Sequence, residues 1–208
     1  MNIAEFKKLP ILGIIRGINL SQLEPLVNCI MSSGLRFIEF TMNTKDAAVI
    51  IQKSAEISKN KLTIGAGTVL SMQDLKIALK SGASFIVSPC LIEDVARYCR
   101  KQKIPYFPGA LTPSEIYKSW QQGATMVKVF PAKCFGPGYF KEIKGPFNEI
   151  QLLACGGINK DTIGQYFANG ASAASFGGSI FKKDLLEKGD YGAIQSSIEE
   201  LIAAYKAL

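Results

Sequence analysis

Three charged residues of this sequence, Lys128, Glu39 and Arg16, lie in apolar stretches that are typical of buried β-strands. Burial disfavours the ammonium form of a lysine, so we expect the Lys128 amine to be kept partly neutral. A neutral amine is a nucleophile, and its commonest use is a Schiff base with a carbonyl substrate. Two ordinary explanations compete with this one: Lys128 extends to solvent, or it forms a buried ion pair with Glu39.

The composition restricts the chemistry that is available to the chain. None of its 208 residues is histidine, which removes imidazole catalysis and most transition-metal sites. The five cysteines are odd in number and contain no Cys-x-x-Cys pair, so they predict neither a disulfide framework nor a zinc site. Any catalysis must therefore rely on Lys, Glu or Asp, Tyr, Cys, Arg or the backbone.

The charge pattern points to a small anionic substrate. The formal net charge is +7, but the lysines are scattered along the chain. A diffuse basic surface suits nucleic acid or a small anion, and no nucleic-acid-binding motif accompanies it. No apolar run approaches the roughly 18 residues that span a bilayer, and the N-terminus lacks the pattern of a signal peptide. We therefore expect a cytoplasmic protein with no membrane and no nucleic-acid partner.

Short apolar runs alternate with amphipathic stretches along the whole chain, which is typical of βα units. Such alternation predicts a parallel sheet, and the simplest closed form is an α/β fold of the TIM type, a (β/α)₈ barrel. An open doubly wound sheet is the alternative. We expect a single domain over residues 1–208. The eight predicted strands are Ile11–Arg16, Phe37–Thr41, Leu62–Gly65, Phe85–Ser88, Tyr106–Pro108, Met126–Phe130, Ile150–Ala154 and Ala173–Phe176.

Capping residues mark the expected helices between these strands. A further amphipathic stretch, Tyr191–Leu208, closes the chain. The predicted starts are Ser21 with Glu24, Thr44 with Asp46, Ser71 with Asp74, Glu93 with Asp94, Thr112 with Glu115, and Asn159 with Asp161. The glycines expected to end helices in a left-handed conformation are Gly34, Gly82, Gly123 and Gly170.

In such a barrel the catalytic groups lie at the carboxyl ends of the strands. Arg16, Glu39 and Lys128 would converge there, and three ionisable groups at one mouth favour a functional site. Two glycine pairs, Gly156-Gly157 and Gly177-Gly178, follow the last two strands. Their backbone N–H groups could bind an anion at the start of a helix turn, where barrels commonly hold phosphate, although glycine pairs also make simple tight turns.

The chain resembles the 2-keto-3-deoxy-6-phosphogluconate aldolase family. This family includes 2-keto-3-deoxy-6-phosphogalactonate aldolase and 4-hydroxy-2-oxoglutarate aldolase, and the resemblance covers nearly all residues. The motifs that carry it are Phe37-Ile38-Glu39-Phe40-Thr41, Gly65-Ala66-Gly67-Thr68-Val69, Val87-Ser88-Pro89, Lys128-Val129-Phe130-Pro131 and the glycine loops that end at Gly157 and Ser179.

The resemblance implies a class I aldolase, usually a homotrimer, in which Lys128 forms the Schiff base and no metal or cofactor is needed. Glu39 would move protons through a water molecule, while Arg16, Gly67 and Thr68 would hold the substrate carboxylate. The residues that would hold the phosphate are Gly156, Gly157, Gly178 and Ser179, and Pro89 is a further expected substrate contact.

The leading functional hypothesis is cleavage of a 2-keto-3-deoxy-6-phospho sugar acid, of gluconate or galactonate type, to pyruvate and glyceraldehyde 3-phosphate. The segment Thr41-Met42-Asn43-Thr44 lacks the Arg that some gluconate-type members carry there, and Cys155 stands where many of them have Thr, so the C4 epimer stays open. Cleavage of 4-hydroxy-2-oxoglutarate to pyruvate and glyoxylate is one alternative, and a catalytically silent sugar-phosphate-binding barrel is another. A thiamine-phosphate-synthase-like transferase would need magnesium-binding carboxylates at the strand ends, where Glu39 is the only one available.

Overall fold

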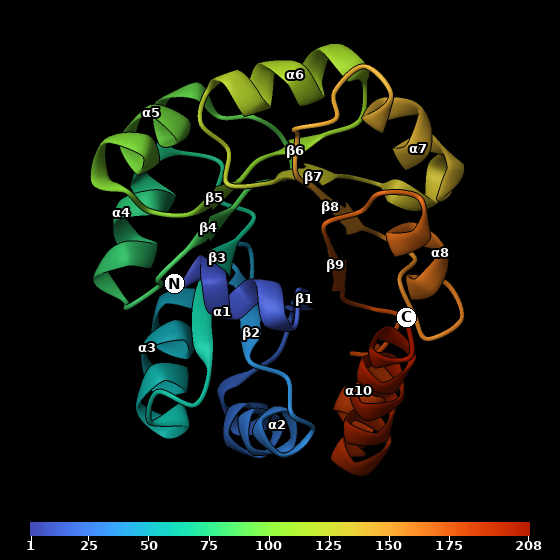
Figure 1. The fold of residues 1–208 in the computed structure, drawn as a ribbon. Coiled ribbons are helices and arrows are strands. Elements are labelled where there is room, and N and C mark those ends of the chain that lie inside the picture. Colours follow the sequence, from blue (N-terminus) through green and yellow to red (C-terminus); the bar gives the residue numbers. More distant parts are fainter.

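The computed structural model describes residues 1–208 and contains one parallel sheet rolled into a barrel (Figure 1). The strand order is β5-β4-β3-β2-β1-β9-β8-β7-β6. Every pairing in this sheet is parallel, and helices cover its outer face. The strands are β1 (Ile11–Ile15), β2 (Phe37–Thr41), β3 (Thr63–Gly67), β4 (Ile86–Val87), β5 (Tyr106–Phe107), β6 (Gly109–Ala110), β7 (Val127–Val129), β8 (Leu152–Cys155) and β9 (Ala173–Phe176).

The two ends of the strand order are joined by a single residue, so the ring of strands closes. Pro108 separates β5, which pairs with β4, from β6, which pairs with β7. Proline has no N–H to donate to a ladder, and it interrupts the strand here while its carbonyl accepts from the Lys128 N–H at 2.9 Å. The predicted barrel is confirmed as a TIM-barrel-like fold. The prediction of eight strands is corrected to nine segments, because the fifth strand is split.

Eleven helical segments complete the chain, and α10 packs against both α2 and α8 on the outside of the barrel (Figure 1). The sequence analysis did not predict α1, α7 or α9. None of the helices is both long enough and apolar enough to cross a bilayer. The helices are α1 (Ile3–Lys8), α2 (Leu20–Ser32), α3 (Ala47–Ser58), α4 (Met72–Lys80), α5 (Glu93–Gln102), α6 (Pro113–Gln121), the 3₁₀ turn η1 (Ala132–Cys134), α7 (Gly138–Lys144), α8 (Ile163–Ala168), α9 (Lys183–Lys188) and α10 (Tyr191–Lys206).

The predicted caps at Ser71 and Thr112 are confirmed, because each hydroxyl accepts an N–H of its helix. The predicted start at Ser21 is wrong, since Asn19 caps α2. Thr44 does not cap α3 either, and its hydroxyl bonds elsewhere. Asn159 accepts N–H groups just ahead of α8, whose cap residue is Thr162. The four helix-ending glycines adopt positive φ angles, as predicted.

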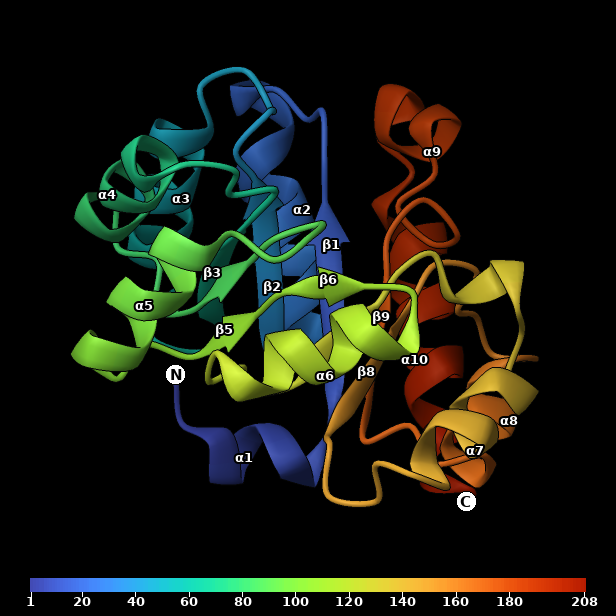
Figure 2. The same cartoon turned by 90° about the horizontal axis from the view of Figure 1, so that it is seen from above.

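A closed aromatic cluster fills the amino-terminal end of the barrel. Helix α1 lies across this end (Figure 2). Its Phe6 packs edge-to-face against Phe37 and Phe107, with ring centroids 4.9 and 6.1 Å apart. Phe85 packs edge-to-face on Phe107 at 5.9 Å. Because apolar side chains close this end, a polar site can form only at the opposite, carboxyl-terminal end of the strands. The whole cluster comprises Phe6, Leu12, Phe37, Phe85, Val87, Phe107, Met126, Leu153 and Ala173.

Candidate active site

A cavity of about 730 Å³ opens at the carboxyl ends of the strands. Most of the predicted site residues lie in its wall, whereas Glu39 and Gly67 do not. The predicted residues in the wall are Arg16, Thr68, Pro89, Lys128, Gly156, Gly157, Gly178 and Ser179. The wall is completed by Ile14, Gly17, Gln22, Phe130, Cys155, Ser175, Gly177, Phe181, Lys183, Leu186 and Glu187.

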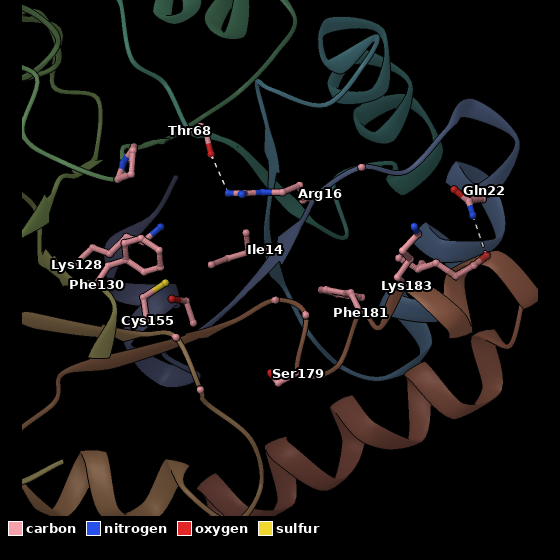
Figure 3. Close-up of a pocket in the computed structure, with 18 of the residues that line it drawn as sticks. Ile14, Arg16, Gln22, Thr68, Lys128, Phe130, Cys155, Ser179, Phe181 and Lys183 are labelled. Carbon is pink, nitrogen blue, oxygen red and sulfur yellow. Dashed lines mark hydrogen bonds between the residues drawn. The ribbon is translucent and has the colours of Figure 1, made fainter. Parts of the chain in front are cut away.

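Lys128 projects from β7 into this cavity and is 7% exposed. Its neighbours in the sheet are Gly109 of β6 and Leu153 of β8. The amine lies 5.3 Å from the centre of the Phe130 ring. Figure 3 shows Lys128 and Cys155 facing one space, with Arg16 and Thr68 across it. Lys128 therefore does not extend to solvent, and its amine is aimed at whatever fills the cavity.

The direction of the Lys128 pKa differs from the prediction. Burial is the largest influence and lowers the pKa of the amine, but its interactions with Cys155 and Glu39 raise it, and the net direction is upward. This direction is opposite to the prediction that burial keeps the amine partly neutral. A raised pKa favours the ammonium form, whose proton must leave before the nitrogen can attack a carbonyl.

Glu39 lies in β2, beneath the cavity, and is 1% exposed. Its Oε2 has no hydrogen-bond partner, and no ion pair within 4.0 Å joins Glu39 to Lys128 or Arg16. The proposed structural ion pair with Lys128 is thus not formed. Burial raises the pKa of the Glu39 carboxyl, and the charges of Lys128 and Arg16 oppose this only in part. A carboxyl group with a raised pKa is suited to both accept and donate protons.

Gly67 serves Glu39 rather than the cavity. A Cβ atom at Gly67 would collide with the Glu39 carboxylate, so the absence of a side chain makes the room that the carboxylate occupies. The two residues belong to paired strands, with Glu39 opposite Gly65 and Thr41 opposite Gly67. The sequence analysis predicted that the backbone of Gly67 contacts the substrate carboxylate, and the structure adds that Gly67 makes room for the Glu39 side chain.

Arg16 and Thr68 meet across the mouth of the barrel. The Arg16 guanidinium donates to the Thr68 hydroxyl at 3.3 Å. Thr68 has φ +54°, a left-handed conformation that a β-branched residue rarely adopts. Backbone strain of this kind concentrates at functional sites, where the surrounding structure holds it. These two residues place a cation and a hydroxyl opposite Lys128, which is the chemistry that a carboxylate needs.

The glycine loops present unused backbone donors to the cavity. The N–H groups of Gly156, Gly157, Gly178 and Ser179 donate to no acceptor within the protein. The Ser179 hydroxyl donates to the Ile158 carbonyl at 2.7 Å. The loop after β9 opens one helical turn, as predicted, because the N–H groups of Ile180 and Phe181 donate to the Gly177 carbonyl at 3.0 and 2.9 Å. The loop after β8 opens no such turn, and the helices α8 and α9 begin later, at Ile163 and Lys183. The free N–H groups alone suit an anion.

The sequence analysis missed several residues of the wall, among them Ile14, Ser175 and Lys183. Ile14 could have been found, since it lies two positions before Arg16 and side chains two apart on a strand share a face. Ser175 lies on β9, directly opposite Cys155 of β8. Lys183 carries no signal of its own, because its place in the wall depends on the path of the loop after β9.

A protonatable amine and a desolvated carboxyl at the open end of an α/β barrel define the class of this protein: an enzyme that acts on carbonyl compounds. The model of the KDPG and KHG aldolase family matches residues 3–197, and the chain belongs to this family. Enzymes of the family are carbon–carbon lyases, and the class I aldolase function that the resemblance implied is thereby supported.

Three relatives illustrate the similarity. The chain is 31% identical to a KHG/KDPG aldolase of Escherichia coli K12 over 199 residues, covering 95% of this chain and 92% of the relative. It is 28% identical to the 2-dehydro-3-deoxy-6-phosphogalactonate aldolase of the same organism, over 84% of this chain and 86% of the relative. A solved structure described as native KDPGal aligns with a TM-score of 0.89 at 25% identity, over 96% of both chains.

Proposed function

We propose that this protein is a Schiff-base aldolase that cleaves a 2-keto-3-deoxy-6-phospho sugar acid to pyruvate and glyceraldehyde 3-phosphate, with Lys128 as the nucleophile. The observation that carries the proposal is the Lys128 amine, 7% exposed and aimed into a cavity that has anion-binding groups beyond it. A binding protein has no need of a buried amine at this place.

The reaction begins with loss of a proton from the Lys128 ammonium group. The neutral nitrogen adds to the C2 carbonyl, and the carbinolamine loses water to give an iminium ion. A base then removes the proton of the C4 hydroxyl, the C3–C4 bond breaks, and its electron pair moves into the iminium. The aldehyde leaves, and the enamine takes a proton at C3 before water releases pyruvate. Because the iminium accepts the electrons, no metal or cofactor is required.

Glu39 is the group that we assign to these proton transfers. Its carboxyl is 1% exposed and outside the cavity wall, so a water molecule must carry protons between it and the substrate. The raised pKa of Glu39 favours this role, since the best acid-base group titrates near the working pH. Gly67 contributes by leaving room for the carboxylate.

The two ends of the substrate fit the two polar sides of the cavity. We assign the substrate carboxylate to Arg16 and Thr68, and the contact with Pro89 to the same end. The phosphate fits the four free N–H groups of the two glycine loops. Those four groups, on Gly156, Gly157, Gly178 and Ser179, favour a phosphorylated substrate over 4-hydroxy-2-oxoglutarate.

The proposal covers both C4 epimers of the substrate, and it includes the oligomeric state and the cellular location of the enzyme. Identities of 28% and 31% to relatives of different names are too similar to separate the gluconate from the galactonate substrate. We assign a homotrimer because the family resemblance implies one. We place the enzyme in the cytoplasm because its proposed substrate is a phosphate ester, which does not cross membranes unaided.

Mass spectrometry of the intact protein after incubation with pyruvate and borohydride tests the proposal. We expect one reduced pyruvate adduct per chain, located at Lys128 by a peptide map. The matched control is Lys76→Met, which removes an exposed lysine on α4 and keeps the adduct. Absence of an adduct in the folded wild type, or an adduct at other lysines that survives Lys128→Met, would overturn the proposal in favour of a silent binding barrel.

A further inference from the structure

A polar turn after β2 holds the backbone of the loop after β1. The Thr44 hydroxyl accepts from the N–H of Gly17 at 3.0 Å and lies 3.0 Å from the Thr41 hydroxyl. Thr41 has no exposed surface and Thr44 is 6% exposed. The turn is itself fixed, because the Thr44 N–H donates to the Thr41 carbonyl at 2.9 Å. Two buried hydroxyls therefore join loops that are far apart in the sequence.

The loop that they hold carries Arg16. The guanidinium of Arg16 is exposed and has a single hydrogen bond, the one to Thr68 at 3.3 Å. Gly17 has φ +70°, and no neighbouring atom lies within 4 Å of the place where its Cβ would be. Side-chain packing therefore does not fix Gly17, and the hydrogen bond to Thr44 does.

Arg16 is also the cationic side chain in the cavity wall that is free to bind a carboxylate. The cationic side chains in the cavity wall are Arg16, Lys128 and Lys183. The Lys183 amine lies 3.6 Å from the Glu187 carboxylate in an exposed pair, and Lys128 has its own role in the proposed reaction. If Arg16 is misplaced, no other free cationic side chain in the cavity wall can bind the carboxylate in its place.

The same turn connects Arg16 to the acid-base group. Thr41 lies two positions after Glu39 on β2, so both side chains are on one face of the strand. In the sheet, Ile14 is opposite Glu39 and Ile15 is opposite Phe40. The hydrogen bonds among Thr41, Thr44 and Gly17 continue this strand pairing beyond the end of β1. The same hydrogen-bonded turn therefore places both Arg16 and Glu39.

We propose that Thr44 is a positioning residue: its hydroxyl, through the N–H of Gly17, sets Arg16 for the carboxylate of the keto acid. The inference rests on the proposed function of the site. Thr44 also helps to shape the turn before α3, since its carbonyl accepts the Ala47 N–H at 3.2 Å. That contact uses the backbone carbonyl, so removing the hydroxyl should abolish the hydrogen bond to Gly17 while the turn before α3 is kept.

The test compares Thr44→Val with Thr44→Ser by exchange of the pyruvate methyl protons in deuterated water, followed by NMR. We expect Thr44→Val to raise the half-saturating pyruvate concentration about tenfold and to leave the saturating rate within about twofold. Thr44→Ser keeps the acceptor oxygen and should behave as the wild type. Equal effects of the two variants, or a loss confined to the saturating rate, would overturn the proposal.

A double-variant cycle with Arg16→Met shows whether Thr44 acts through Arg16. If it does, adding Thr44→Val to Arg16→Met changes half-saturation by less than about twofold, because the shared interaction is already lost. A full tenfold further change contradicts the proposal. Thr44→Ala replaces Thr44→Val if thermal unfolding shows that the valine variant does not fold. Wild-type protein without a borohydride adduct refutes the proposed aldolase, whereas normal trapping with unchanged Thr44→Val half-saturation refutes only the role of Thr44.

Discussion

The two ends of the barrel differ in composition: one is lined by apolar side chains and the other by polar groups. At the amino-terminal end, Phe6, Phe37 and Phe107 close the barrel with edge-to-face aromatic packing that leaves no polar atom to satisfy. At the carboxyl-terminal end, Glu39 keeps an unpartnered buried oxygen, and the cavity is lined by free backbone N–H groups. One end gains stability from burial, and the other retains unsatisfied groups that a substrate can satisfy.

The comparison teaches that stability and chemistry can be separated along one set of strands. Gly65 and Gly67 are two positions apart on β3, yet each makes room for a different end of the barrel. A Cβ at Gly65 would collide with the Phe85 ring of the sealed end, whereas a Cβ at Gly67 would collide with the Glu39 carboxylate. Substitutions at the sealed end should therefore alter the free energy of unfolding, and those at the open end should alter the reaction.

The largest expected effect is that of Lys128→Met. Without the amine no iminium can form, so kcat for aldol cleavage should fall by about 10⁴-fold or more. The free energy of unfolding, measured in urea, should not decrease, because a buried charge is replaced by an apolar chain of similar length. Activity within about tenfold of the wild type would remove Lys128 from the proposed mechanism.

Glu39→Gln should keep covalent trapping of pyruvate but slow proton transfer. We expect methyl-proton exchange of pyruvate in deuterated water to fall by about 10²- to 10⁴-fold, the usual contribution of a general acid-base group. NMR measures the exchange, and the borohydride adduct provides the control for Schiff-base formation. Unchanged exchange would show that another group moves the protons.

Phe6→Ala tests the sealed end. It should lower the free energy of unfolding by about 3–5 kcal/mol, because a fully buried ring in an aromatic cluster is lost. Chemical denaturation measures the change, with Phe6→Leu as a milder control that keeps most of the apolar volume. At a temperature where Phe6→Ala is folded, kcat should match that of the wild type; a large loss of kcat would mean that the two ends are not independent.

The glycines of β3 give a matched pair of substitutions. Gly65→Ala should cost about 1–3 kcal/mol of unfolding free energy through overpacking against Phe85, with little change in kcat. Gly67→Ala should displace Glu39 and lower the exchange rate by about 10²-fold, as misplacement of a catalytic group by about 1 Å can do. Denaturation and NMR exchange, run on both variants, should therefore give opposite rankings.

The smallest expected effect is a pH dependence of stability. Burial raises the pKa of folded Glu39 above its ordinary value of 4.5, so the folded state binds the proton more tightly than the unfolded state. Stability should therefore decrease as pH rises from about 4.5 through the folded pKa. Glu39→Gln removes this dependence and should be more stabilising at pH 7 than at pH 4. Denaturation at the two pH values measures it, and an equal change at both would contradict the raised pKa.

Local patterns predicted much of the architecture and of the site. β-branched and aromatic runs gave the strand positions, and the caps at Ser71 and Thr112 were recognisable because a cap is made within four residues. Thr44 was misread as a cap, since its hydroxyl is used by Gly17, which lies 27 positions away. A contact of that kind leaves no mark in the local sequence.

The sequence by itself determined which residues we assign to the chemistry. Lys128 and Glu39 stand out because a charge inside an apolar strand is costly unless it is used. Arg16 was predicted to end a buried strand, but it lies just after β1 and is exposed. Only the tertiary structure decided how those charges behave. The pKa of Lys128 is raised instead of lowered because Cys155 and Glu39 approach it from other strands. Electrostatic interactions depend on distances in space, and those distances are set when the barrel closes at Pro108 and the turn at Thr44 fixes the loop beside Arg16.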